Sequence, residues 1–562
     1  MTGRRPNRRI RLLAAVFAAV FGVAFLRAGW LQAVRAGTLG HLAATQQKET
    51  IALPAHRGTI YDRTGMPLAI GERAVSIYAD PRQVADPRAV ALAVGRTLGV
   101  EPGTLLPLLA DRTRGFVYLA RKADPEKAGA LQRAHIAGLG FIPEERRTYP
   151  QRRIGAQVVG YAGTDNHGLS GLELQLDKPL AGTDGTETVV RDPFGRTIDV
   201  LSERPERDGR NVYLTLDHTL QAQLQRVLAE TRNRWGAKAA TGIVMDPRTG
   251  GILAMAVDPG YDANRFPRVA RDLQRNRAVT DTYEPGSTFK VVAIGGALAQ
   301  RLVSPSTQYV LPPSIRVADR VIHDAEPRGT ETLSVAQILS RSSNVGVVTV
   351  ALGLGKNHLS DWIRRFGFGR RTGIDYPGES AGIVLPRDRW SGSTIGNVPI
   401  GQGIAVTPLQ MVAAYGAVAD GGDWIQPHLV DRVEGAALVH PKRRRVLTRG
   451  TARALTKMLE GVVQDGGGTG TAAQVPGYAI AGKTGTAAKP DPDGGYSTTR
   501  YVASFVGYVP AWRPRLVILV AVDEPRGAIY GGTVAAPAFA EIAKFALQYL
   551  SVPPNPQLLA QG

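Results

Sequence analysis

The longest apolar run of the chain lies near its start. Leu12–Leu26 contains no charged residue, and the run continues to Val34 if the Arg27 side chain reaches out to a membrane surface. At about 1.5 Å per residue, a helix over this run spans a hydrocarbon layer of roughly 30 Å. Arginines before the run place the N-terminus in the cytoplasm and the rest of the chain outside it. A cleaved signal peptide is the alternative, because the charge-free core is short; Trp30 and Arg35 favour an uncleaved anchor.

Between residues 36 and 210, short runs typical of strands are separated by turns. Arg57–Gly65 and Val75–Tyr78 are examples, and one helical pattern near Lys127–His135 interrupts them. This half of the chain shows no catalytic spacing. We therefore predict a strand-rich, non-catalytic module that binds a partner or acts as a spacer.

From residue 211 to 552, strand patterns occur at both ends and helical patterns lie between them. Thr241–Asp246 and Gly251–Val257 flank the turn Pro247–Gly250, which predicts a hairpin. Other strands are predicted at Asn211–Asp217, Tyr478–Thr486, Val502–Val509 and Leu516–Val522, and helices at Thr219–Trp235, Val291–Leu298, Leu333–Leu339, Val345–Leu354, Pro408–Ala419, Thr451–Val463 and Ala538–Leu550. The simplest assembly is one mixed or antiparallel sheet with helices on both faces.

These patterns predict a multidomain α+β protein. Its expected parts are a cytoplasmic tail and transmembrane anchor (1–35), the N-terminal module (36–210), a sheet-and-helix domain (211–552) and a C-terminal tail (553–562). A length of 562 residues is enough for two to four domains, each with its own core.

Composition and charge narrow the class of protein. The chain is 43% hydrophobic and 21% charged, which excludes disordered and collagen-like proteins. It contains no cysteine, which excludes disulfides, thiolate metal sites, iron–sulfur clusters and cysteine nucleophiles. The net charge is +20, but the basic groups are scattered and lack interleaved aromatic residues. Basic surfaces near an anionic membrane or polymer are therefore favoured over nucleic-acid binding.

The stretch Glu284-Pro285-Gly286-Ser287-Thr288-Phe289-Lys290 carries the first candidate chemistry. Pro and Gly precede Ser287 and an apolar run follows, which predicts that Ser287 lies in the first turn of a buried helix. Positions i and i+3 share a helix face, so the Ser287 hydroxyl and the Lys290 amine should point the same way. This pairs a nucleophile with a base, and the helix start favours the negative charge of an acyl-transfer intermediate.

Two further polar stretches lie on suitable elements. Ser342-Ser343-Asn344 sits in a turn between two apolar helices, where an ordinary loop more often carries Gly or Pro. Lys483-Thr484-Gly485-Thr486 ends a strand pattern. For each stretch alone, a helix start, a loop or an edge strand with a turn is an adequate explanation.

Three other motifs are rejected as sites. Residues 477–484 match the Walker A pattern, but Pro476 precedes them and Gly485 blocks the helix that a phosphate loop needs. Residues 378–382 match the nucleophile-elbow pattern, yet they follow Tyr376-Pro377 and read as a turn. His323-Asp324 has no further ligands at metal spacing, so we interpret it as surface or packing. We predict no metal and no cofactor.

The order Ser287-x-x-Lys290, Ser342-x-Asn344, Lys483-Thr484-Gly485-Thr486 resembles the three motifs of penicillin-binding proteins and serine β-lactamases. The second motif has Ser343 where class A β-lactamases have Asp, which favours a transpeptidase. Further stretches resemble class B penicillin-binding proteins, and Glu284-Pro285-Gly286 and the length resemble their cell-division (FtsI-type) subgroup. Those class B stretches are Arg57–Gly65, Gly160–Glu173, Gly401–Gly403 and Thr407–Gln410.

The resemblance implies the following site roles. Ser287 would attack the penultimate D-alanine of a peptidoglycan stem peptide, with Lys290 as the base. Ser342 would relay a proton to the leaving amine, and Asn344 would hold the substrate amide. Lys483 and Thr484 would bind the terminal carboxylate, Gly485 would admit the substrate backbone, and the backbone N–H groups of Ser287 and Thr486 would form the oxyanion hole.

It also implies partners: D-Ala-D-Ala stem peptides, β-lactams, a SEDS-type glycan polymerase and divisome membrane proteins. The expected location is the inner membrane, with a single span and a periplasmic or extracellular catalytic domain. Three alternatives stay open: an elongation-type transpeptidase, a D,D-carboxypeptidase or β-lactamase in which water resolves the acyl-enzyme, and a β-lactam-binding scaffold or sensor.

Overall fold

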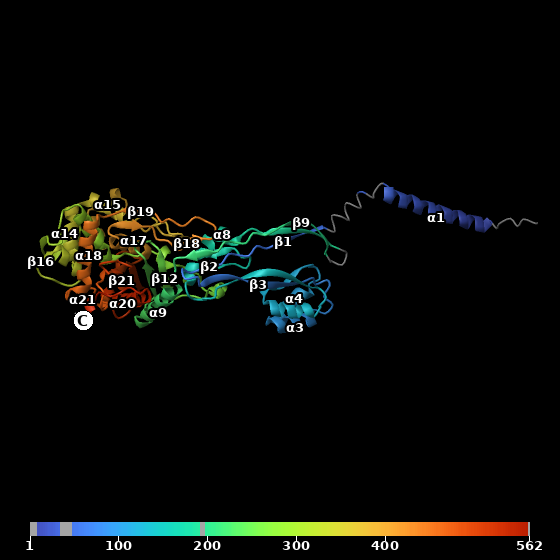
Figure 1. Cartoon of the computed structure of the whole chain (residues 1–562), viewed down its shortest axis with the longest axis horizontal. Helices are drawn as coiled ribbons and strands as arrows, with labels where there is room; N and C mark the ends of the chain where they lie inside the picture. Colours follow the sequence, from blue (N-terminus) through green and yellow to red (C-terminus); the bar gives the residue numbers. More distant parts are fainter. Residues whose placement is uncertain (1–7, 34–36, 38–47, 192–196, 560–562) are drawn as a thin grey trace, which may run out of the picture. The chain divides into compact units, whose positions relative to one another are not determined.

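Two units make up the computed structural model, which describes residues 8–33, 37, 48–191 and 197–559 (Figure 1). The first unit comprises residues 1–56 and 182–209, and the second comprises residues 57–181 and 210–562. We describe each unit by itself. Among the sequence features discussed above, Arg4, Arg5, Val34 and Arg35 lie outside the described residues.

The first unit contains one long helix and one small sheet. Helix α1 (Arg8–Ala33) is apolar, exposed along its whole length and long enough to cross a membrane. This confirms the helix predicted for the first apolar run. Strands β1 (Lys48–Leu53), β8 (Gly185–Arg191) and β9 (Thr197–Arg204) form an antiparallel sheet in the order β1-β8-β9.

In the second unit, a six-stranded sheet joins segments that are far apart in sequence. The long strand β3 (Pro67–Ala79) pairs with β2 (Ile60–Tyr61), β4 (Val117–Ala123) and β5 (Leu139–Thr148). Beyond β2 follow β10 (Val212–Leu214) and β18 (Val430–Val433), which come from the region predicted to be catalytic. Helices α3 (Pro87–Leu98), α4 (Pro102–Ala110) and α5 (Pro125–Arg133) enclose a small core of their own.

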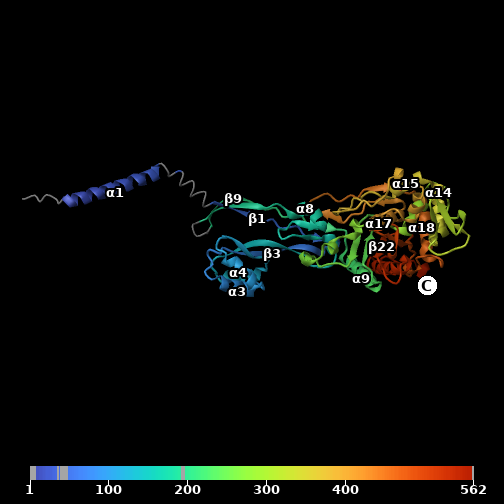
Figure 2. The ribbon, with the colours of Figure 1, turned by 180° about the vertical axis from the view of Figure 1, so that it is seen from behind.

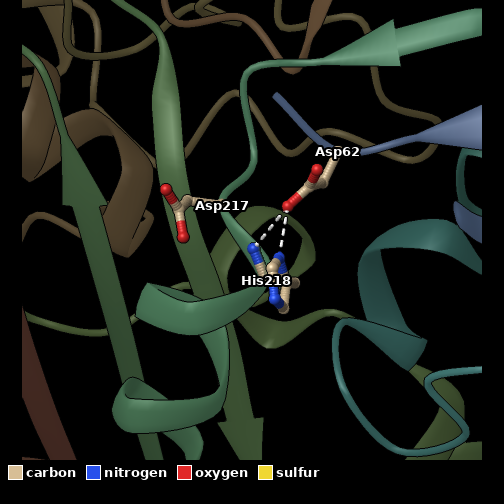
Figure 3. Close-up of side chains that lie close together, drawn as sticks. All are labelled: Asp62, Asp217 and His218. Atoms are coloured by element: carbon tan, nitrogen blue, oxygen red, sulfur yellow. Dashed lines mark hydrogen bonds and ion pairs between the residues drawn. The ribbon is translucent and has the colours of Figure 1, made fainter. Parts of the chain in front are cut away.

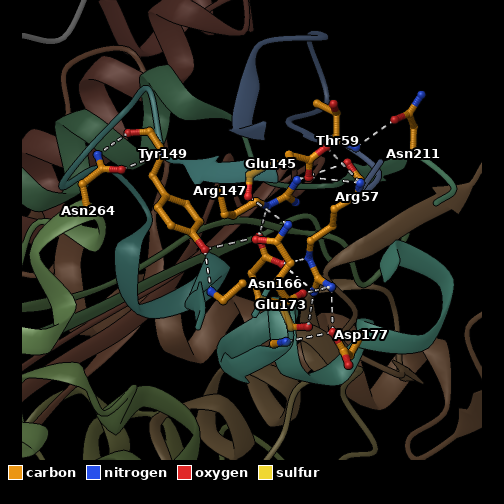
Figure 4. Close-up of polar contacts among 12 residues, drawn as sticks. Arg57, Thr59, Glu145, Arg147, Tyr149, Asn166, Glu173, Asp177, Asn211 and Asn264 are labelled. Atoms are coloured by element: carbon orange, nitrogen blue, oxygen red, sulfur yellow. Dashed lines mark hydrogen bonds and ion pairs between the residues drawn. The ribbon is translucent and has the colours of Figure 1, made fainter. Parts of the chain in front are cut away.

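A buried ionic network lies between the stretches Arg57–Gly65 and Gly160–Glu173 (Figure 4). The Arg57 Nε donates to Glu173 Oε2 at 2.8 Å, and Arg147 Nε donates to Glu173 Oε1 at 2.6 Å. Arg57 also donates to Asp177 at 2.7 Å. The Glu173 side chain is fully buried, so its charge is stabilised by these guanidinium groups rather than by water.

We expect Glu173→Ala to lower the free energy of unfolding by about 3–5 kcal/mol, because it leaves two buried guanidinium groups without their shared carboxylate. Urea denaturation of the full-length protein in detergent, compared with wild type, measures the loss. Glu72→Ala is the matched control, since its ion pair with Arg146 is half-exposed and should contribute less than about 1 kcal/mol. Equal losses in the two variants would contradict this reading.

The second sheet of this unit is five-stranded and antiparallel throughout. Its strands are β11 (Ala239–Met245), β12 (Ile252–Asp258), β20 (Ala481–Pro490), β21 (Tyr496–Val509) and β22 (Leu516–Asp523), in the order β12-β11-β22-β21-β20. Both the hairpin predicted near residue 250 and the single sheet with strands from both ends of the domain are confirmed. Strand β20 lies at the edge.

Helices cover both faces of this sheet, because alternate residues of its strands face opposite cores. In β22, Ile518, Val520 and Val522 face one core, whereas Val517 and Leu519 face the other. Helices α9 (His218–Arg234) and α20 (Ala536–Tyr549) lie together on the first face (Figure 2). On the second face are α12 (Lys290–Ala299), α14 (Asn344–Leu354), α17 (Pro408–Ala419) and α18 (Arg449–Gln464).

Shorter elements border the second face. They are β13 (Gln308–Leu311), β14 (Ser314–Val317), β15 (Arg320–His323), β16 (Glu331–Ser334), α13 (Val335–Ser340) and α15 (Lys356–Phe366). Two of the three rejected motifs, the Walker A match and the nucleophile-elbow match, lack the elements that their sites require. Residues 481–484 of the Walker A match belong to strand β20, and residues 378–382 comprise the end of a turn and irregular backbone, without a strand-to-helix elbow.

Candidate active site

Ser287 lies in a 3-10 turn, Gly286–Phe289, that leads directly into α12. This confirms the predicted helix start. Gly286 has a φ of +55°, and a Cβ there would come within 2.8 Å of the Thr486 carbonyl oxygen. Only glycine combines that backbone conformation with such a close approach, so it brings the Ser287 turn against β20. The Gly286 N–H donates to the carbonyl of Gly401 at 3.1 Å, which fixes the other side of the turn.

The Lys290 amine is fully buried and held by three acceptors from one turn. Its Nζ donates to the Ser342 carbonyl at 2.5 Å, to the Ser342 hydroxyl at 3.1 Å and to Asn344 Oδ1 at 2.8 Å. Ser342 has a φ of +61°, a conformation that non-glycine residues rarely adopt. The turn therefore has a strained shape whose acceptors converge on one amine.

Burial lowers the pKa of Lys290 well below its usual value, and the positive charges of Lys483 and Arg328 lower it further, while Asp324 opposes them. The Ser287 hydroxyl makes no hydrogen bond with any residue that the structure describes. The predicted shared face of Ser287 and Lys290 thus places the two residues one helical turn apart, but the amine is directed to Ser342 and Asn344.

The Lys483–Thr486 stretch lies on β20, with a fully buried Lys483. Lys483 Nζ donates to Thr484 Oγ1 at 3.0 Å and to the Thr484 carbonyl at 3.2 Å. Burial lowers the pKa of Lys483 to about 7. The Thr484 hydroxyl also lies 2.8 Å from that of Thr469. Thr469 was not found from the sequence, because it sits in a glycine-rich loop without a motif of its own.

Gly485 and Thr486 complete the stretch. A Cβ on Gly485 would lie 2.4 Å from Ser504 Oγ and 2.9 Å from Thr288 Cγ2, so a side chain there would push β20 away from the Ser287 turn. The Thr486 hydroxyl accepts from the Gly531 N–H at 3.2 Å. The close packing of β20 against Ser504 and Thr288 therefore explains why residue 485 is a glycine.

A cluster of Asp62, Asp217 and His218 has the spacing of a metal site (Figure 3). Both oxygens of Asp62 and one oxygen of Asp217 already accept hydrogen bonds within the protein. Asp62 Oδ2 accepts from His218 Nδ1 at 2.6 Å, and its Oδ1 accepts from the N–H and hydroxyl of Thr64, each at 2.7 Å. Asp217 Oδ1 caps the start of α9. We interpret the cluster as a structural contact that links the end of β2 to the start of α9.

The geometry around Ser287 suits a serine acyltransferase: an antiparallel sheet lies between helical layers, Ser287 and the buried Lys290 lie beside its edge strand β20, and the buried Lys483 lies on that strand. Comparison with known proteins identifies the family within that class. Residues 240–544 match the penicillin binding protein transpeptidase domain, and residues 52–214 match the penicillin-binding protein dimerisation domain. The chain belongs to the penicillin-binding protein transpeptidase family.

Relatives match along nearly the whole chain. Penicillin-binding protein PbpB of Mycobacterium tuberculosis is 36% identical over 98% of this chain and 86% of its own length. The peptidoglycan D,D-transpeptidase FtsI of Escherichia coli K12 is 32% identical over 95% of this chain and 91% of its own. The crystal structure of penicillin binding protein 3 of M. tuberculosis complexed with aztreonam has a TM-score of 0.72 at 32% identity, and covers 91% of this chain and 99% of its own.

Proposed function

We propose that the chain is a membrane-anchored peptidoglycan D,D-transpeptidase that cross-links stem peptides through an acyl-enzyme at Ser287. The observation that carries this assignment is the buried amine of Lys290, one helical turn from Ser287 and bound by Ser342 and Asn344. A lysine with a strongly lowered pKa beside a nucleophile has the properties of a general base.

In the first half-reaction, Ser287 Oγ attacks the carbonyl carbon of the penultimate D-alanine, and its proton passes to the neutral Lys290 amine. The oxygen of the tetrahedral intermediate is stabilised by the backbone N–H groups of Ser287 and Thr486. The C–N bond then breaks, and the departing D-alanine takes a proton through the Ser342 hydroxyl. An ester on Ser287 remains.

In the second half-reaction, the amine of a neighbouring stem peptide attacks this ester. A proton from that amine returns through Lys290 to Ser287 Oγ, the ester C–O bond breaks and a new amide forms. Earlier, while the intact donor is bound for the first half-reaction, Asn344 holds its amide, and Lys483 and Thr484 bind its terminal carboxylate, which then leaves with the D-alanine. Because the pKa of Lys483 is about 7, a bound carboxylate would stabilise its protonated form.

We also propose that β-lactams acylate Ser287. The relatives from M. tuberculosis were solved as complexes with aztreonam and with ampicillin. A β-lactam presents a strained amide and an anionic group next to it, which match the attacking serine and the Lys483 site. The proposed enzyme needs no metal or cofactor for either half-reaction.

A donor peptide ending in D-Ala-D-Ala, offered with an acceptor amine, tests the assignment. We expect one D-alanine released for each cross-linked product. D-Alanine release with hydrolysis alone would indicate a carboxypeptidase instead. Rapid turnover of a fluorescent penicillin would indicate a β-lactamase. If the protein neither binds the penicillin covalently nor releases D-alanine, it would be a non-catalytic scaffold.

The remaining proposals concern location and partners. Helix α1 is proposed to be an uncleaved single span in the inner membrane, with a cytoplasmic N-terminus and a periplasmic or extracellular catalytic domain. We keep the four predicted parts as functional divisions: the tail and anchor (1–35), the N-terminal module (36–210), the catalytic domain (211–552) and the C-terminal tail (553–562). Because Glu284-Pro285-Gly286 resembles the FtsI-type subgroup, we propose a role in septal wall synthesis, with a SEDS-type glycan polymerase and divisome proteins as partners of the anchor and N-terminal module.

A further inference from the structure

Asp324 follows strand β15 and lies beside the Ser-Ser-Asn turn. Its side chain is only 9% exposed. One carboxylate oxygen accepts from the Val345 N–H at 3.0 Å and from the Asn344 N–H, and the Ser343 hydroxyl donates to the other at 3.0 Å. Of the two sequence interpretations given for His323-Asp324, surface fits His323, which is exposed, and packing fits Asp324.

These contacts fix the start of α14. Asp324 accepts from the first two N–H groups of the helix, and Ser343 Oγ accepts from the third, that of Gly346, at 3.0 Å. All three would otherwise lack an intrahelical partner. A negative charge at this end of a helix is also favourable. The turn preceding α14 is thus held by a carboxylate from a different part of the chain.

The same turn holds the Lys290 amine. Asn344 directs its Oδ1 to Lys290 and its Nδ2 to the carbonyl of His323, at 2.9 Å. The end of the β14–β15 hairpin therefore fixes Asn344 twice, through the His323 carbonyl and through the Asp324 carboxylate. The backbone of the turn is also held from α13, through the Ser342 N–H to Leu339 at 3.2 Å and the Ser343 N–H to Ile338 at 2.9 Å, and Asp324 adds a charged acceptor from the other side.

We propose that Asp324 is a positioning residue for acyl transfer, which holds the 342–344 turn in the shape that places Ser342 and Asn344 around the Lys290 amine. The inference rests on the proposed function, because it gives that turn a role in proton transfer. Asp324 acts through the turn and does not contact the substrate. It extends the active site to a hairpin that carries none of the three motifs.

Three charged groups act on the Lys290 amine, and they come from two segments. Asp324 and Arg328 lie between β15 and β16, with their side chains 3.7 Å apart, and Lys483 lies on β20. Beyond the effect of burial, Lys483 and Arg328 lower the pKa of Lys290 and Asp324 raises it. Neutralising Asp324 should therefore lower the pKa of Lys290 further, whereas neutralising Arg328 should raise it.

The rate of acylation by a fluorescent penicillin, measured across pH on the full-length protein in detergent, tests the proposal. We expect Asp324→Asn to lower the maximal rate roughly 10- to 100-fold, since hydrogen bonds to a charged acceptor are weakened. In the pH profile of this variant, the acidic limb, where protonation of Lys290 lowers the rate, should move to lower pH, because Lys290 loses its proton more readily. Arg328→Gln should move that limb to higher pH.

Asp217→Asn is the matched control. Asp217 is also largely removed from solvent and caps α9 through two N–H groups, at 3.1 and 3.2 Å, on the opposite face of the sheet. We expect this variant to keep both the rate and the pH limb of wild type.

A purely structural cap would leave Asp324→Asn with the maximal acylation rate of wild type, as expected for Asp217→Asn, and this result would overturn the proposal. The proposal would also be overturned if the acidic limbs of the Asp324→Asn and Arg328→Gln profiles moved in the same direction. If Asp324→Asn does not fold, Arg328→Gln decides, because an unmoved limb there also counts against it. A wild-type chain that never labels would instead overturn the proposed function itself.

Discussion

Replacement of Ser287 by alanine is expected to abolish covalent labelling by a fluorescent penicillin. The hydroxyl supplies the atom that bonds to the acyl group, so no ester can form without it. Loss of a catalytic nucleophile lowers turnover by factors on the order of 10⁴ to 10⁶, which leaves no measurable labelling over minutes. The assay is gel fluorescence of the full-length protein after a timed exposure, with melting temperature as a check on folding.

The chain provides a matched control for this experiment. Ser380 lies in the rejected nucleophile-elbow match, in irregular backbone that follows a turn. Its hydroxyl accepts from the Gly382 N–H at 3.2 Å. We expect Ser380→Ala to label at the wild-type rate. Labelling of Ser287→Ala, or its loss in Ser380→Ala, would refute the assignment of the nucleophile.

The elements of the catalytic domain could be predicted because they are set by local pattern. The uninterrupted apolar run Leu516–Val522 indicates a strand with two buried faces, and Thr407-Pro408 indicates the start of α17, where a capping box is present. Ser287 could likewise be placed at a helix start from Pro285 and Gly286 alone. These signals lie within a few residues of the positions that they specify.

The contacts that shape the site could not be predicted, because they join residues that are far apart in sequence. Asp324 meets Ser343 across 19 positions, and Thr469 meets Thr484 across 15. No local pattern indicated that β10 and β18 pair beside β2. This pairing connects the N-terminal strands to the catalytic region. Register and long-range polar pairing depend on the whole fold rather than on local propensity.

The acceptors of Lys290 show the same limit at the level of one amine. Helical spacing predicted that Lys290 would face Ser287, and it does lie one turn away. Spacing alone could not show that three acceptors of a strained turn hold the amine. This arrangement suits a protonated lysine, whereas burial favours the neutral form. The two opposing effects leave the proton of Lys290 easily transferred.

Lys290 itself provides the second test with a large expected effect. Lys290→Met removes the base and should slow acylation by about 10²- to 10⁴-fold, the range typical of general base catalysis. Lys290→Arg keeps a cation that can donate to Ser342 and Asn344, but a guanidinium does not lose its proton at accessible pH. If the neutral amine is the base, both variants lose acylation alike, and the acidic limb of the wild-type pH profile disappears from both. That limb reports the proton on Lys290, and the lowered pKa of Lys290 places the limb below the usual pH range of a lysine.

Full activity in a folded Lys290→Arg variant, judged by its melting temperature, would show that Lys290 acts only as a fixed positive charge.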